Sequence, residues 1–302
     1  MRRRRRPPET ARGALVLIGG AASPSGPALA EFVRRADAAA GGLVVGLTTA
    51  SADPAGSADA WRRDLEAAGA RDTRFPLVVN RAQARSREVV ALIREARGIF
   101  LGGGDQIHLI ATIGGSPLEE AIYEAYCRGA VVCGTSAGAA ALTETTLANG
   151  EVDEDGNLIE MYIGPGLGLL GYRTMIDTHF AQRRRLQRLF VAIAGYPELL
   201  GLGIDEDTAL VVEGHVGEVV GRGAVTFVDG RSVRFDNADE VRKGRQLTLS
   251  HLRVGIVGTG YRFDLREREL EVLLPETDAQ RRGGGDEDGW DDASATRNTR
   301  AP

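Results

Sequence analysis

Residues 134–138, Gly-Thr-Ser-Ala-Gly, carry a serine in a setting that suits nucleophilic chemistry. They fit the G-x-S-x-G elbow, in which glycines permit a sharp turn that exposes the serine hydroxyl. The apolar residues 130–133 precede the motif and the alanine-rich residues 139–142 follow it, so a strand and a helix flank the turn as the motif requires. We therefore expect Ser136 to be the nucleophile of a hydrolase. The alternative for this motif taken alone is a tight glycine turn with a helix-capping serine.

A serine hydroxyl is a weak nucleophile and needs a base, most often a histidine that an acceptor orients. Of the four histidines, His179 follows the short apolar run 175–177, so we expect it at the carboxyl end of a strand, like Ser136. The other three are expected to be structural or solvated. Residues 205–207, Asp-Glu-Asp, form an acidic turn between apolar runs. Spacing alone leaves all three carboxylates open as the acceptor.

Arginines crowd the segment that follows His179. Residues 180–193 have the period of a helix, with apolar residues at i, i+3, i+4 and i+7 from Leu186. Cations are disfavoured near the amino end of a helix, and like charges three or four residues apart repel each other. An anionic partner would remove this conflict, and the planar guanidinium of arginine suits carboxylates. The pattern thus favours a carboxylate-bearing substrate over a solvated basic face.

A second glycine-rich turn, at residues 100–106, joins a predicted strand to a predicted helix. We expect Gly104 to supply an amide for an oxyanion beside the amide of Ala137, with a plain strand-to-helix turn as the alternative. Residues 166–171, Gly-Leu-Gly-Leu-Leu-Gly, match the dinucleotide fingerprint in letters. They lack the buried strand and the helix that this fingerprint needs, so no nucleotide is expected.

The candidate site residues are far apart in the sequence, so the fold must bring the ends of several strands close together. Through the first half of the chain, short β-branched runs alternate with stretches of helical period, which predicts an α/β fold: a mostly parallel sheet with helices on both faces. We predict strands at 14–18, 43–47, 73–78, 98–100 and 130–133, and helices at 27–40, 58–68, 86–96 and 118–128. Open sheets of this kind place their sites at the carboxyl ends of the strands.

The second half of the chain has a different pattern. Residues 151–171 are glycine-rich and loop-like, whereas short strands at 209–212, 216–220 and 224–227 indicate added antiparallel strands. We predict one α/β domain at 13–275, between a disordered basic arm at 1–12 and a disordered tail at 276–302.

Composition narrows the classes of function. A net charge of -5 over 302 residues gives no global attraction to nucleic acid or to an anionic membrane. No apolar stretch approaches the roughly 18 residues of a membrane span. Two cysteines are too few for a disulfide framework, and no Cys/His group has metal-ligand spacing. We expect a soluble, cytoplasmic protein without a metal or cofactor, whose partners are neither nucleic acid nor membrane.

Several segments together resemble cyanophycinase and its relatives. They are residues 15–21, 103–106, 134–139, 177–183 and 203–209, and their order and spacing match the family as well as their letters. The resemblance spans residues 13–274. It implies a serine peptidase with a flavodoxin-like α/β fold, usually a homodimer, that uses no metal and is related to the aspartyl dipeptidases. Cyanophycinase hydrolyses cyanophycin, a polyaspartate with arginine on each β-carboxyl, and releases β-aspartyl-arginine.

The resemblance also implies roles for single residues. Ser136 is similar to the nucleophile of the family, His179 to its base, and Glu206 to its acid, which chooses among the three carboxylates that spacing left open. Positions that resemble substrate-binding residues of the family are Gln106, Asp177, Arg183, Arg185 and Arg188. The implied partners are carboxylates of an aspartyl substrate for the arginines and a substrate guanidinium for Asp177.

Thr178 departs from the family pattern, which has glutamine immediately before the histidine. Threonine is shorter and offers one hydroxyl in place of an amide, so we expect a change in substrate recognition but not in the chemistry of the triad. The leading expectation is hydrolysis of cyanophycin through an acyl-enzyme. Two alternatives stay open: a dipeptidase that acts on small aspartyl peptides, and a catalytically silent protein that binds acidic peptides.

Overall fold

The computed structural model describes residues 11, 13–152, 158–241 and 245–271. The predicted basic arm at 1–12, apart from Ala11, and the predicted tail at 276–302 lie outside these ranges. All described residues belong to one compact unit, which ends at Glu271. The domain limits at 13 and 275 stay a prediction.

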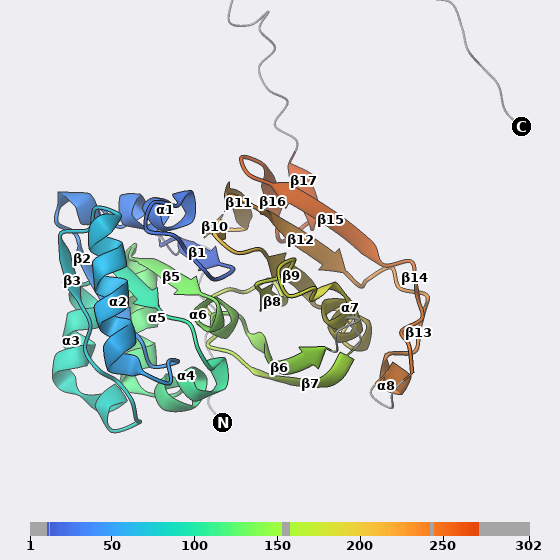
Figure 1. The fold of residues 1–302 in the computed structure, drawn as a ribbon, viewed down its shortest axis with the longest axis horizontal. Helices are drawn as coiled ribbons and strands as arrows, with labels where there is room; N and C mark the ends of the chain where they lie inside the picture. The colour runs from blue at the N-terminus through green and yellow to red at the C-terminus, as the bar shows by residue number, and fades with distance from the viewer. Residues whose placement is uncertain (1–10, 12, 153–157, 242–244, 272–302) are drawn as a thin grey trace, which may run out of the picture. The chain divides into compact units, whose positions relative to one another are not determined.

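Five parallel strands form one end of a nine-stranded sheet (Figure 1), and they confirm the predicted α/β class. In spatial order they are β1 (Leu15–Ile18), β5 (Val131–Thr135), β4 (Gly98–Leu101), β2 (Leu43–Leu47) and β3 (Asp72–Arg74). Alternate side chains of a strand point to opposite faces of a sheet. Leu15 and Leu17 accordingly pack in one core cluster, and Val16 and Ile18 in another. Both faces of this sheet are therefore covered.

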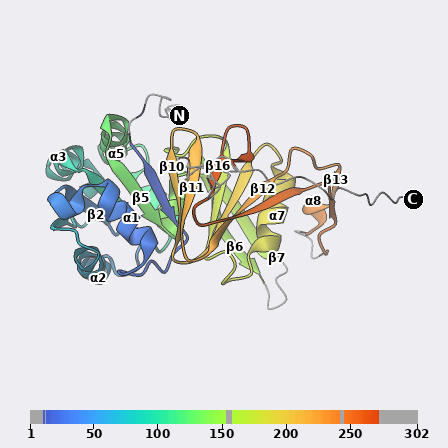
Figure 2. The same ribbon diagram turned by 90° about the horizontal axis from the view of Figure 1, so that it is seen from above.

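Helices provide that cover (Figure 2). The face of Val16 is packed by α1 (Pro27–Arg35) and α2 (Pro54–Ala67), and the face of Leu15 by α3 (Arg87–Glu95), α4 (Gln106–Ile113) and α5 (Pro117–Arg128). At the start of four of these helices, α2 to α5, a capping side chain accepts a hydrogen bond from a backbone amide. Short 3₁₀ turns lie at Ala38–Ala40 and Gln83–Arg85.

The predicted antiparallel strands are present, but they divide between two sheets. The sheet that contains the five parallel strands continues beyond β1 with β10 (Thr208–Glu213), β11 (Val216–Gly221), β16 (Arg262–Asp264) and β17 (Glu269–Glu271). A second sheet has the order β15 (Arg253–Gly258), β12 (Ala224–Asp229), β9 (Leu200–Ile204) and β8 (Thr174–Thr178). Only β8 and β9 run parallel in this four-stranded sheet. The chain crosses from the second sheet to the first between β9 and β10, at residues 205–207.

The segment predicted as a loop at 151–171 contains a strand, β7 (Leu158–Pro165), which pairs antiparallel with β6 (Thr145–Val152). Only the last two residues of β6 lie inside the predicted loop. Its glycine and polar residues did not signal strands, because the pairing comes from tertiary context and not from intrinsic propensity. Small elements complete the fold: β13 (Phe235–Asp236), α8 (Ala238–Val241) and β14 (Leu249–Ser250).

The helix predicted at 180–193 begins later, at Leu186 (α7, Leu186–Gly195). Residues 180–185 form turns, and Arg184 has a φ of 52°, which lies outside the helical region. This placement removes the expected repulsion within a first helical turn, because only Arg188 of the arginine cluster lies inside the helix. The other three, Arg183, Arg184 and Arg185, lie in the turns that precede the helix.

Candidate active site

Ser136 lies at a strained turn between β5 and α6 (Ala137–Ala141). Its φ of 52° and ψ of -119° are rare for a residue with a side chain, and such strain gathers at functional sites. The glycines of the motif make the turn possible, because a Cβ on Gly134 would stand 2.6 Å from the backbone of Gly138. The amide of Ser136 donates to the carbonyl of Ile18 at 2.9 Å, which fixes the turn to β1.

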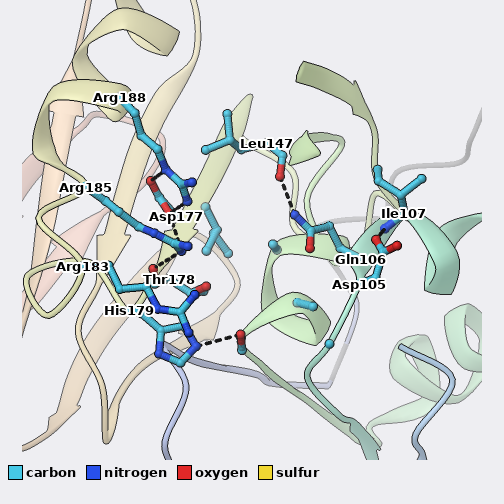
Figure 3. Close-up of a pocket in the computed structure, with 15 residues that line it drawn as sticks. Asp105, Gln106, Ile107, Leu147, Asp177, Thr178, His179, Arg183, Arg185 and Arg188 are labelled. Carbon is cyan, nitrogen blue, oxygen red and sulfur yellow. Dashed lines mark hydrogen bonds and ion pairs between the residues drawn. The ribbon is translucent and has the colours of Figure 1, made fainter. Parts of the chain in front are cut away.

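His179 faces the serine from the end of β8. Its Nε2 lies 2.9 Å from Ser136 Oγ, and its Nδ1 lies 2.6 Å from Glu206 Oε1 (Figure 3 draws the first contact). The backbone amide of His179 donates to the carbonyl of Gly19 at 2.7 Å. A serine hydroxyl, an imidazole and a carboxylate in this sequence of contacts form the arrangement of a hydrolytic triad.

The acidic turn contributes only one of its three carboxylates to His179. Asp205 accepts hydrogen bonds from the backbone amides of Ala181 at 3.0 Å and Ala224 at 3.1 Å. Asp207 accepts the amide of Ser23 at 3.1 Å and pairs with Arg222 at 3.1 Å.

Asp205 and Asp207 are therefore engaged elsewhere, and Glu206 alone reaches the imidazole. The role of Glu206 as the acid of a triad stays a prediction.

The surroundings of His179 favour its neutral form. Burial, the largest cause, lowers the pKa of His179 below its ordinary value of 6.5, and the cations of Arg183 and Arg185 act in the same direction. The hydrogen bond that the imidazole makes to the carboxylate of Glu206 acts in the opposite direction but does not reverse the shift. A neutral imidazole can accept a proton, so His179 has the protonation state that a general base needs at neutral pH.

A cavity of about 550 Å³ opens in front of Ser136, within the size range of ligand pockets. Every residue predicted for the site lines it except Glu206, which contacts His179. The predicted lining residues are Gly104, Gln106, Ser136, Ala137, Asp177, Thr178, His179, Arg183, Arg185 and Arg188. Sequence reasoning missed Leu147, because its hairpin gave no strand signal. The carbonyl of Leu147 accepts a hydrogen bond from Gln106 Nε2 at 2.6 Å, which ties the hairpin to the pocket wall (Figure 3).

The surroundings of Asp177 differ from the expectation that it receives a substrate guanidinium. Its carboxylate is buried, with 1% exposure, and is held by two arginines of the chain itself. Arg188 donates through Nε at 2.7 Å and also through Nη2, and Arg185 Nη1 lies 3.3 Å away (Figure 3). Burial lowers the pKa of Arg185 to about 10, so Arg185 is still a cation at neutral pH. Asp177 thus orients Arg185 and Arg188 beside the cavity.

Arg183 differs from these two arginines. It lines the cavity next to His179 (Figure 3), and its side chain makes no ion pair within the described part of the chain. An anion in the cavity would therefore meet a guanidinium that is not already neutralised. Arg184, the next residue, is exposed and does not line the cavity.

Backbone amides lie next to the nucleophile. In the described ranges, the amides of Gly103, Gly104 and Ala137 donate to no protein acceptor. A Cβ on Gly103 would stand 3.2 Å from the Cβ of Ser136, so this glycine turn passes directly beside the serine. Gly104 and Ala137 were predicted as oxyanion donors, and Gly103 is a further candidate that the sequence did not single out.

Metal-binding clusters and membrane-spanning helices are both absent from the described ranges. No group of three or more His, Cys, Asp or Glu side chains has the geometry to hold a metal ion there. None of the helices in these ranges is both long enough and apolar enough to cross a membrane.

The α/β fold and the Ser136, His179 and Glu206 contacts define the class of serine hydrolases. The profile of peptidase family S51 matches residues 43–220. The chain belongs to this family of hydrolytic peptidases, which confirms the resemblance to cyanophycinases and their relatives.

Named relatives agree with this assignment. The chain is 35% identical over 273 residues to a cyanophycinase of Synechococcus elongatus, covering 87% of this chain and 83% of the relative. It is 34% identical over 270 residues to a cyanophycinase of a Nostoc species, covering 88% and 90%. Among solved structures, a peptidase from an acI-B1 actinobacterium has a TM-score of 0.62 at 23% identity, covering 83% of this chain and 96% of that one. The last similarity supports the fold.

Proposed function

We propose that this peptidase hydrolyses cyanophycin to β-aspartyl-arginine through an acyl-enzyme on Ser136. The observation that carries the proposal is the pair of contacts that link Ser136 to His179 at 2.9 Å and His179 to Glu206 at 2.6 Å. Two relatives at 35% and 34% identity are named cyanophycinase, and both align over more than four fifths of this chain, which supports the choice of substrate.

Acylation begins with the transfer of the Ser136 proton to Nε2 of His179. The serine Oγ then attacks the carbonyl carbon of an aspartyl peptide, and the carbonyl oxygen becomes an oxyanion. In this mechanism the amides of Gly104 and Ala137, together with that of Gly103, donate hydrogen bonds to this charge. Glu206 stabilises the imidazolium through Nδ1. His179 then returns the proton to the leaving amine, the C–N bond breaks, and an ester on Ser136 remains.

Deacylation repeats these steps with water. His179 takes a proton from a water molecule, the hydroxide attacks the ester carbon, and the same amides hold the second oxyanion. The proton returns to Ser136 Oγ as the ester bond breaks. The product leaves with a new carboxylate, and the enzyme is restored without a metal or a cofactor.

The charges of the cavity favour a substrate that carries free carboxylates. Arg183 is the cation that can bind a free carboxylate of the substrate, at the end of the aspartyl chain or on an arginyl residue, while Arg185 and Arg188 add positive potential from positions that Asp177 fixes. Gln106 and Thr178 supply polar groups on opposite walls (Figure 3). From the family resemblance we propose a homodimer, which light scattering of the full chain would test. The low cysteine content supports the proposal of a cytoplasmic location.

Mass spectrometry of the products from cyanophycin tests the proposal. The full chain and a control with the exposed Ser25→Ala are expected to release β-aspartyl-arginine, whereas Ser136→Ala is expected to release none. Undiminished hydrolysis by Ser136→Ala would remove this serine from the mechanism.

The same assay separates the two alternatives. Cleavage of aspartyl dipeptides without cleavage of the polymer would favour a dipeptidase, and Thr178→Gln would then be expected to restore some polymer cleavage. Binding of acidic peptides without turnover, and without labelling of Ser136 by an active-site serine reagent, would favour a silent binding protein.

A further inference from the structure

Two segments leave the second sheet side by side and carry the base and the acid of the site. Residues 179–185 follow β8 and residues 205–207 follow β9, and these strands are parallel neighbours in the register Thr178 to Ile204. The amide of Phe180 donates to the carbonyl of Ile204 at 3.2 Å, which continues the pairing one residue beyond the strands. The relative position of His179 and Glu206 therefore depends on how the two segments are joined.

Beyond that point, the two segments exchange a reciprocal pair of hydrogen bonds. The amide of Ala181 donates to Asp205 Oδ1 at 3.0 Å, and the amide of Glu206 donates to Gln182 Oε1 at 3.1 Å. Each segment thus supplies one side-chain acceptor and one backbone donor. Asp205 is additionally fixed by the amide of Ala224, whereas Gln182 reaches the residue that contacts the imidazole.

We propose that Gln182 is a positioning residue that holds the backbone of Glu206 so that its carboxylate stays on Nδ1 of His179. The inference rests on the proposed hydrolysis with His179 as base. The side chain of Glu206 is 34% exposed, so packing alone does not fix it. Three hydrogen bonds hold the backbone here. The amide of Glu206 donates to Gln182, and Thr208 Oγ1 donates to the carbonyl of Glu206 at 3.0 Å. The amide of the next residue, Asp207, donates to the carbonyl of Gly20 at 2.9 Å.

Gln182 acts from outside the cavity. It is exposed, and it is not among the residues that line the pocket. Its replacement therefore leaves the core and the cavity wall intact. We expect turnover to fall while substrate binding is unchanged, since the lost hydrogen bond serves the base and not the substrate.

The pH profile provides a second signature. The charged groups that act on His179 are Glu206, which raises its pKa, and Arg183 and Arg185, which lower it. If Glu206 moves away, the pKa of His179 falls and the acid limb of kcat/KM moves to lower pH. A glutamate at position 182 would still accept the hydrogen bond from the amide of Glu206. Its negative charge would raise the pKa of His179, so the acid limb of kcat/KM would move to higher pH.

The experiment compares Gln182→Leu and Gln182→Glu with the full chain, using hydrolysis of cyanophycin over a range of pH. For Gln182→Leu we expect kcat to fall about tenfold, KM to stay within about twofold, and the acid limb to shift downward. For Gln182→Glu we expect recovery of most of kcat and an upward shift. Gln187→Leu, the same change in the adjoining helix α7, serves as the matched control and is expected to behave as the unaltered chain.

Wild-type kcat and pH profile in Gln182→Leu would overturn the inference, and so would a fall in kcat that Gln182→Glu does not reverse. A rise in KM without a change in kcat would also overturn it, because Gln182 would then serve binding. The proposed function fails independently if Ser136→Ala retains full hydrolysis, so the two failures are distinguishable.

Discussion

The imidazole of His179 lies against the backbone of Gly20, so closely that a Cβ on residue 20 would overlap the ring. We predict that Gly20→Ala displaces the imidazole from Ser136 and lowers kcat/KM by about a hundredfold or more, because catalytic groups tolerate little misplacement. Gly41→Ala is the control, since Gly41 has a similar φ of 98° but open space around it. Equal losses in the two variants would show that backbone strain, and not the contact with the ring, is responsible.

The pH dependence of activity is expected to follow the lowered pKa of His179. The imidazole must be neutral to accept the serine proton, so kcat/KM should rise with pH through this pKa and level off above it. We therefore expect the midpoint of the acid limb below 6.5, the ordinary value.

Glu206→Gln should lower the plateau and move the limb to still lower pH, because the anion that raises the pKa is removed. A limb at or above 6.5 in the full chain would contradict this account.

Stability should respond to the same group. Because the folded state holds the pKa of His179 below 6.5, the unfolded chain binds the proton first as the pH falls. The contribution of His179 to the free energy of unfolding is thus fully present above 6.5 and decreases as the pH falls toward the folded-state pKa. Urea unfolding of Ser136→Ala and of Ser136→Ala combined with His179→Gln, compared at several pH values, would measure the difference.

Arg183→Met is expected to raise KM for cyanophycin about tenfold, because the charge-assisted bond to a substrate carboxylate is lost. The same change should move the acid limb to higher pH, since the cation of Arg183 lowers the pKa of His179. Arg184→Met, at the neighbouring exposed arginine outside the cavity, is the matched control. If both variants raise KM equally, general positive potential would explain binding better than a specific contact.

Asp177→Asn should destabilise the fold by about 3 to 5 kcal/mol, because two arginines would lose the buried anion that they share. The exposed pair of Asp72 and Arg74 provides a comparison, and Asp72→Asn should cost less than about 1 kcal/mol. Urea unfolding at neutral pH measures both changes. Similar small losses would mean that Asp177 is better solvated than its 1% exposure indicates.

Local patterns were sufficient to predict most of the parallel half of the fold, although the strand predicted at 73–78 is β3, which ends at Arg74. Strands β1, β2, β4 and β5 are short, apolar and bounded by glycine or helix-capping residues, so each carries its own signal. The elbow at Ser136 was predictable for the same reason, because its glycines, its strand and its helix are contiguous in sequence.

Features that depend on distant contacts were not predictable in this way. The hairpin β6–β7 is stabilised by its own pairing and by packing on α7, and its sequence has no clean alternation. The late start of α7 depends on residues 180–185 being held by the turn at 205–207, which lies far away in the chain. The pairing of Asp177 with Arg185 and Arg188 also required the structure, because its sequence pattern suits a substrate ligand equally well.

The division into two sheets has a consequence for the whole molecule. Ser136 stands at the end of β5 in the larger sheet, His179 at the end of β8 in the smaller one, and Glu206 on the crossing between them. The rate of turnover therefore depends on the position of the two sheets relative to each other. A slight separation of the two sheets would move the three residues apart and stop turnover, while each sheet kept its internal hydrogen bonds. On heating, activity should therefore be lost at a lower temperature than the circular dichroism signal.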